Sequence, residues 1–216
     1  MRVAPGVEVS ALLVAPPRPR ALFVLAHGAG ADMRHAFLEA VAQRLAARGT
    51  ATLRYQFPYT EQGGRRPDPE PLLLATVRAA VAAGREAAGG LPLIAGGKSM
   101  GGRMTSRAAA EAPLEGVRGL AFLGFPLHPA GRPGTSRAEH LARTTVPLLF
   151  LQGTRDALAD LALLAPIVAQ LGPRATLRTF ADADHMFHVR KRSGGTDAQV
   201  LDALADAIAA WAEARA

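Results

Sequence analysis

The 216-residue sequence predicts an α/β fold in which a mostly parallel β-sheet is covered by helices on both faces. Two observations lead to this expectation. Short apolar runs bounded by glycine, proline or polar residues recur along the chain, as is typical of buried strands. Segments with apolar residues at helical spacing separate the later runs, and this alternation implies parallel strands joined by right-handed crossovers.

Seven apolar runs are expected to form strands, namely VEVSALLV (7–14), ALFVLAH (21–27), ATLRYQF (51–57), LPLIAG (91–96), GLAFLGF (119–125), PLLFLQG (147–153) and ATLRTF (175–180). The first strand or two are expected to run antiparallel to the others. Five segments carry the helical pattern, and several of them close with glycine or proline: 34–48, 70–88, 100–112, 158–171 and 196–214. The polar stretch 62–71 is expected to be a loop. No Ser/Gly-rich linker divides the chain, so we expect one domain over residues 1–216.

Composition limits the class of protein before any motif is considered. Apolar residues make up 49% of the chain and charged residues 20%, as in a globular domain. No uninterrupted apolar stretch of about 18 residues is present, so we expect no membrane association. The start of the chain lacks the apolar core of a signal peptide because Pro16, Pro17 and Arg18 interrupt it, and we expect a cytoplasmic location. The absence of cysteine excludes disulfides, thiolate zinc sites and a cysteine nucleophile.

The net charge of +7 raises the question of nucleic-acid binding. The arginines are scattered along the chain, and the one dense basic group is Arg190, Lys191 and Arg192. Such a distribution is typical of a solvated surface, so we expect no nucleic-acid partner. A preference for an acidic substrate stays open, since the group closely follows a candidate catalytic histidine. The sequence does not specify an oligomeric state.

The stretch AGGKSMGGRM (95–104) carries the strongest functional signal. Its Gly-Lys-Ser element resembles a phosphate-binding loop, but that motif requires a glycine at position 92, where the chain has Pro92. The pattern G-x-S-x-G at Gly97–Gly101 directly follows an expected strand and opens an expected helix, as a nucleophile elbow requires. We therefore expect Ser99 to be a nucleophile in a strained turn. Its glycine neighbours would avoid steric clashes with the adjacent strand and helix.

A serine nucleophile needs a base that an acid orients. Asp156 follows the strand expected at 147–153, and His185 follows the strand expected at 175–180, which gives the order Ser, Asp, His. The rival acids are Asp160, Asp182 and Asp184. The group Asp182, Asp184, His185 and His188 has the residue types of metal ligands without an accepted ligand spacing, so we expect neither a metal nor a cofactor.

The oxyanion of an acyl-transfer intermediate needs preorganised amide donors. Met100, directly after the nucleophile, is expected to supply one amide. The loop LAHGAGADM (25–33) is expected to supply the other, from Ala29 or, as a fallback, from Gly30. His27 in the same loop is expected to hold the loop in place and not to carry a proton.

Four strings, HGAG, GKSMGG, LQGTRD and ADHMF, occur in an order that resembles the small α/β-hydrolases related to dienelactone hydrolase, over residues 20 to 212. RYQFPY, GGKSMGGRM, GFPLHP and FLQGTRD are similar to a subgroup that includes a subunit of a chromatin-associated acetyltransferase complex and testis-expressed protein 30. The resemblance implies the α/β-hydrolase fold, the triad Ser99, Asp156 and His185, and an oxyanion hole at Met100 and residues 28–30. Dienelactone hydrolase itself uses a cysteine nucleophile, so its substrate does not transfer.

Only residues 126–146 separate two strands where many hydrolases of this fold insert a lid, so we expect no lid domain and a shallow, accessible site. The residues expected to line an acyl pocket follow two strands: Tyr55, Phe57, Tyr59, Phe125, Leu127 and His128. Arg103 and Lys98 are candidates for binding a carboxylate or phosphate, although Lys98 is expected to point away from the substrate. His35 and His140 are expected at the surface and Trp211 in the core.

These features predict a serine hydrolase that cleaves an ester or related acyl bond of a small-molecule acyl substrate through an acyl-enzyme. One alternative is a non-catalytic or weakly active interaction module with the same fold. Another is acyl transfer to an acceptor other than water, which shares the first chemical step.

Overall fold

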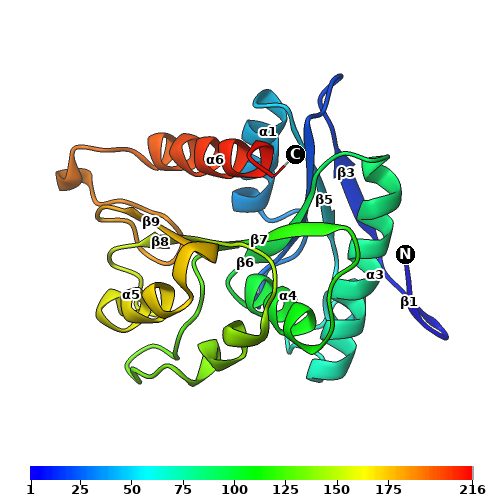
Figure 1. Cartoon of the computed structure of the whole chain (residues 1–216), viewed down its shortest axis with the longest axis horizontal. Coiled ribbons are helices and arrows are strands. Elements are labelled where there is room, and N and C mark those ends of the chain that lie inside the picture. The colour runs from blue at the N-terminus through cyan, green and yellow to red at the C-terminus, as the bar shows by residue number, and fades with distance from the viewer. Residues whose placement is uncertain (216) are drawn as a thin grey trace.

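A seven-stranded sheet runs through the centre of the computed structural model, which describes residues 1–215 (Figure 1). Residue 216 of the expected domain lies outside the described residues. The sheet order is β3 (Ala11–Val14), β5 (Thr50–Tyr55), β4 (Ala21–Ala26), β6 (Leu93–Lys98), β7 (Val117–Leu123), β8 (Leu148–Gly153) and β9 (Ala175–Phe180). β3 pairs with β5 antiparallel, and every other neighbouring pair is parallel. The mostly parallel sheet with an antiparallel first strand is therefore confirmed.

The run 7–14 forms two strands where the sequence predicted one. β2 (Val7–Glu8) pairs with β1 (Arg2–Ala4) in a separate two-stranded sheet, and only β3 joins the main sheet. The break falls at Ser10, whose amide donates to Glu61 Oε2 at 2.7 Å and whose hydroxyl donates to Glu61 Oε1 at 2.8 Å. An amide that a carboxylate holds cannot take part in a strand ladder, so the strand is interrupted there.

Helices cover both faces of the main sheet, as expected (Figure 1). α1 (Ala36–Ala47) and α6 (Asp197–Glu213) pack on one face, and α3 (Glu70–Ala88), α4 (Met100–Glu111) and α5 (Leu161–Gln170) pack on the other. The side chains of successive strand residues point to opposite faces of the sheet. Phe23 in β4 packs under α1 and α6, whereas Leu22 and Val24 pack under the opposite layer of helices. The strands are thus buried from both sides, which is why their sequences are continuous apolar runs.

Short helical segments complete the chain: α2 (Pro58–Glu61), η1 (Ser136–Arg143), η2 (Gly172–Arg174) and η3 (Lys191–Ser193), the last three of the 3₁₀ type. Between β7 and β8 the chain forms only loop and η1, so no lid domain is inserted there. α5 begins at Leu161 and not at 158, because Asp160 caps the helix by accepting a hydrogen bond from the Ala162 amide at 2.8 Å.

His140 and Trp211 do not lie where the sequence predicted. His140, expected at the surface, is only 3% exposed and its Nε2 lies 2.7 Å from Ser106 Oγ. Burial lowers the pKa of His140 to about 4, and the positive charges of Arg107, Arg103 and Arg143 act in the same direction. Trp211 packs against the edge of the core and remains half-buried. His35 is half-buried at the start of α1, where its ring accepts a hydrogen bond from the Phe37 amide.

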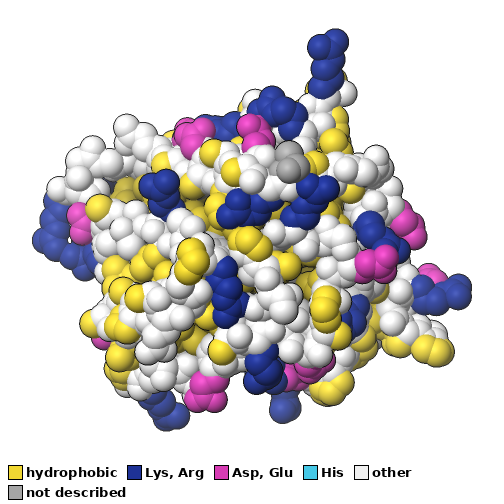
Figure 2. Space-filling model, in the orientation of Figure 1, with side chains coloured by type: hydrophobic (Ala, Val, Ile, Leu, Met, Phe, Trp, Pro, Cys, Tyr) yellow, Lys and Arg dark blue, Asp and Glu magenta, His cyan; other side chains and the backbone are white. Residues whose placement is uncertain are grey.

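The exterior carries charge in scattered positions. Figure 2 shows Lys and Arg side chains dispersed over one face of the molecule, several of them beside Asp or Glu. The ion pairs Arg20–Glu213 and Arg48–Asp206 belong to this exterior. Within residues 1–215, no helix combines the length and the apolar composition needed to cross a bilayer.

Candidate active site

Ser99 occupies the single residue between β6 and α4. Its backbone has φ 51° and ψ −117°, in the left-handed half of conformational space that residues other than glycine rarely adopt. The Ser99 amide donates to the Leu123 carbonyl of the neighbouring strand at 3.1 Å, and the Ser99 carbonyl accepts from the Arg103 amide at 3.1 Å. Such a conformation costs on the order of 1–3 kcal/mol and persists because the flanking strand and helix impose it.

The glycines beside Ser99 are required by close packing. A Cβ atom on Gly101 would lie 2.5 Å from the His27 carbonyl oxygen, and one on Gly97 would overlap the Ala26 carbonyl oxygen. In both cases the atom in the way is backbone, which cannot rotate aside. The sharp turn therefore brings β4, β6 and α4 so close together that side chains are excluded at these two positions.

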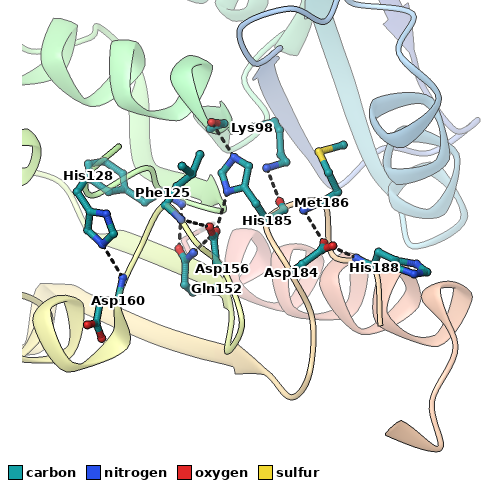
Figure 3. Close-up of polar contacts among 12 residues, drawn as sticks. Lys98, Phe125, His128, Gln152, Asp156, Asp160, Asp184, His185, Met186 and His188 are labelled. Atoms are coloured by element: carbon teal, nitrogen blue, oxygen red, sulfur yellow. Dashed lines mark hydrogen bonds and ion pairs between the residues drawn. The ribbon is translucent and has the colours of Figure 1, made fainter. Parts of the chain in front are cut away.

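A continuous chain of hydrogen bonds joins Ser99, His185 and Asp156. His185 Nε2 lies 2.9 Å from Ser99 Oγ, and His185 Nδ1 lies 2.7 Å from Asp156 Oδ2 (Figure 3). The Asp156 side chain has no solvent exposure, whereas the His185 side chain is 21% exposed. An ionised carboxylate can only accept, so Nδ1 must carry the proton and Nε2 is left to accept from the Ser99 hydroxyl.

The buried Asp156 carboxylate has further donors. Gln152 Nε2 donates to Oδ2 at 2.5 Å, and the Leu158 amide donates to Oδ1 at 2.8 Å. Gln152 Oε1 in turn accepts from the Phe125 amide at 2.9 Å, which fixes the orientation of the side-chain amide (Figure 3). Sequence reasoning missed Gln152. The available signal was a single polar residue at the end of the otherwise apolar run PLLFLQG.

Lys98 points away from Ser99, to the other face of the sheet. Its Nζ donates to the His185 carbonyl at 2.6 Å (Figure 3). The same atom lies 5.7 Å from the centre of the Phe187 ring. Burial lowers the pKa of Lys98 to about 8, while the negative charges of Asp156 and Asp184 act in the opposite direction. The ammonium group thus ties the end of β6 to the segment that carries His185.

Two of the three rival acids have other side-chain partners, and the third lies in a turn. Asp160 caps α5, and Asp184 Oδ1 accepts from the Met186 amide at 2.8 Å and from the His188 amide at 3.0 Å. Asp182 is a turn residue with φ 55°. His188 pairs through Nδ1 with Asp197 Oδ2 at 2.7 Å. In the part of the chain that the structure describes, no group of three or more His, Cys, Asp or Glu side chains is arranged to hold a metal ion.

Two of the three candidate oxyanion donors lie beside Ser99. Met100 is the first residue of α4, so its amide has no partner within the helix, and Ala29 lines the same cavity as Ser99 and Met100. Gly30 lies at a different, neighbouring cavity. His27 is fully buried, its Nδ1 lies 2.8 Å from the Gly28 carbonyl, and its Nε2 accepts from the Phe57 amide at 3.2 Å. Burial lowers the pKa of His27, and these bonds hold its loop against the start of α2.

A cavity of about 420 Å³ opens beside Ser99. Its wall includes Arg103 and Met104 of α4, Arg137 of η1, and Leu158. None of the six residues expected to form an acyl pocket lines this cavity; all six are buried: Tyr55, Phe57, Tyr59, Phe125, Leu127 and His128.

The six residues hold the surrounding loops in place. Phe57 and Tyr59 stack with their ring centres 6.4 Å apart, and Phe125 packs edge-on against Phe122 at 5.4 Å. His128 Nε2 accepts from the Asp160 amide at 3.0 Å (Figure 3). Aromatic residues after the strands are used here for loop packing, so the cavity is built instead from α4, η1 and residues 67–73.

Comparison with known proteins agrees with this architecture. Residues 19–213 match a family described as "Alpha/beta hydrolase domain". The chain is similar to the dienelactone hydrolase of Anabaena variabilis, at 24% identity and a TM-score of 0.73, over 95% of this chain and 91% of that chain. It is also similar to an α/β serine hydrolase without a lid from Xanthomonas campestris, at 21% identity and a TM-score of 0.70, over 94% of this chain and 95% of that one.

A third similar structure is Est1E of Butyrivibrio proteoclasticus with bound ferulic acid, at 16% identity and a TM-score of 0.70, over 94% of this chain and 95% of that chain. At such identities these three structures establish a common fold.

Proposed function

The chain belongs to the α/β-hydrolase domain family, and from this premise we propose that it is a serine hydrolase that cleaves an ester or related acyl bond. The observation that carries the proposal is the hydrogen-bonded chain from Ser99 through His185 to the buried Asp156. The strained turn that presents Ser99 is the second support. Similar structures that are described as hydrolases agree with this class of reaction.

The proposed reaction proceeds through an acyl-enzyme. His185 Nε2 takes the Ser99 proton as Oγ attacks the acyl carbonyl, and Asp156 stabilises the imidazolium that forms. The amides of Met100 and Ala29 stabilise the tetrahedral oxyanion. His185 then protonates the leaving group, and the C–O bond breaks. Water, deprotonated by His185, attacks the acyl-enzyme and releases the acid and Ser99.

The distribution of burial suits these roles. The Asp156 side chain has no solvent exposure and two donors besides His185, so its carboxylate is held in a fixed position. His185 is partly exposed, which allows it to exchange its proton with solvent and leaving group. We further propose that the chain is related to the subgroup that includes the chromatin-complex subunit and testis-expressed protein 30. We also propose that the protein is located in the cytoplasm.

A fluorophosphonate probe and a short activated ester test the proposal together. We expect the purified protein to hydrolyse the ester and to be labelled at Ser99, and both signals to disappear in Ser99→Ala. Ser193→Ala, which changes a serine in η3, is the matched control and keeps both signals. Labelling that persists in Ser99→Ala would refute the assignment of the nucleophile. A folded protein without labelling or turnover would refute the hydrolase function and favour an interaction module.

A further inference from the structure

The cavity beside Ser99 carries an unusual pair of basic side chains. Arg103 lies four residues after Ser99, one turn along α4 and on the same face of that helix. Arg137 reaches the cavity from η1, which packs against α4. Two guanidinium groups from different elements therefore line the space next to the nucleophile.

Neither guanidinium group has a protein partner among residues 1–215. Arg103 Nε is buried without a hydrogen-bond partner, and no carboxylate lies within ion-pair distance of Arg103 or Arg137. The carboxylates on the cavity wall are engaged elsewhere, since Glu70 Oε1 pairs with Arg107 NH2 at 2.5 Å and Asp68 Oδ2 accepts from the Tyr59 amide at 2.9 Å. Neither arginine side chain is therefore neutralised by a neighbouring carboxylate, and both can pair with a negative group that enters the cavity.

Other arginines lie close enough to Arg103 to repel its charge. Burial lowers the pKa of Arg103, and repulsion from Arg137 and Arg107 adds to the shift, with Glu70 opposing it. Burial, with a further contribution from the charges of Arg107, Arg103 and Arg143, lowers the pKa of the nearby His140 to about 4. A negative group bound here would meet several cations within a partly desolvated space.

We propose that Arg103 and Arg137 select acyl substrates that carry an oxyanion group, a carboxylate or a phosphate, away from the scissile bond. This inference rests on the proposed function, because it names the substrate class of the same site. Each arginine can offer parallel N–H donors to two oxygens of such a group. Ser99 would then attack the carbonyl while the distal charge fixes the substrate in the cavity.

Matched para-nitrophenyl esters test the proposal. The half-ester of adipic acid carries a distal carboxylate, the heptanoate ester is neutral and of equal length, and an ω-phosphono ester of the same length carries a phosphonate. We expect kcat/KM to favour at least one charged ester over the neutral one. Arg103→Met and Arg137→Met should each reduce that preference about tenfold, and added salt should reduce it as well.

Two further variants control the experiment. Arg132→Met removes an exposed arginine from the same loop region without touching the cavity, and it should keep the preference. Arg103→Lys retains a charge without the paired donors, so partial retention of the preference separates recognition from misfolding. Circular dichroism checks that each variant is folded.

The outcomes separate the two proposals. Preference for the carboxylate or for the phosphonate supports the inference and identifies the oxyanion. A wild-type protein that is labelled at Ser99 yet prefers the neutral ester overturns the inference alone, as does a preference that survives both methionine variants. Absence of labelling and of all turnover overturns the proposed function, and the inference with it.

Discussion

Replacing Lys98 by methionine should change how stability depends on pH. Lys98 is 5% exposed and has a pKa of about 8 in the folded protein, against 10.5 for an unperturbed lysine. Between these two values the unfolded chain binds a proton that the native protein has released, so the free energy of unfolding rises with pH. Integrated from pH 7 to pH 9.5, this linkage contributes about 2 kcal/mol.

Methionine has a similar volume and does not titrate, so Lys98→Met should remove this contribution. A comparison of the stabilities of wild type and variant at a single pH is uninformative, because two effects of the substitution oppose each other. The variant avoids the cost of burying a charge, about 3 kcal/mol, but it loses a charge-assisted hydrogen bond to the His185 carbonyl that contributes about 1.5–3 kcal/mol. The diagnostic quantity is the change with pH of the difference between the two proteins.

Urea unfolding at pH 7 and pH 9.5, followed by the fluorescence of Trp211, the only tryptophan, measures this difference. Lys191, the second lysine in the sequence, is exposed, and Lys191→Met serves as the control with an unchanged pH dependence. Parallel stability curves for wild type and Lys98→Met over this range would show that the Lys98 pKa is not depressed.

Three other predictions concern the site, the acid limit of stability and a helix end. Asp156→Asn should lower kcat by about 10⁴-fold while fold and ester binding persist, because the amide favours the wrong tautomer of His185; steady-state kinetics checks this. The pKa of His140 is about 4 in the folded protein and 6.5 when unperturbed, so stability is lost as the pH falls from 6.5 to 4. Wild-type protein should therefore be less stable at pH 4.5 than at pH 7, and His140→Gln should reduce that difference in unfolding free energy by about 2 kcal/mol. Thr196 and Gln199 form a capping box at the start of α6, and Thr196→Ala should lower the free energy of unfolding by about 1 kcal/mol in urea titration, without changing the proposed ester hydrolysis.

Sequence reasoning anticipated the features that local backbone requirements fix. The turn at Ser99 demands glycine at Gly97 and Gly101, and such a demand is visible as a spaced pattern along the chain. The alternation of runs likewise predicts parallel strands, because a crossover helix leaves few other options. Asp156 and His185 followed from their position after late strands, and the structure brings both to Ser99.

The features that the sequence did not predict depend on contacts between distant segments of the chain. The burial of His140 follows from the packing of η1 on α4, which no local pattern records. The cavity wall combines α4 with η1, and the aromatic residues expected there fill the core because the loops need them for packing. Even the break in the first expected strand is caused by Glu61, 51 positions after Ser10.

The segment that carries His185 begins at the margin of the sheet. β9 is the terminal strand, pairs only with β8 and contains exposed residues, so its opening exposes less apolar surface than global unfolding does. Edge elements of this kind open at lower free energy than the core. Activity should therefore decline at lower denaturant concentration than the fluorescence of Trp211 changes. The bond from Lys98 to the His185 carbonyl anchors this segment to the central strand β6, so weakening that bond should move the two transitions further apart.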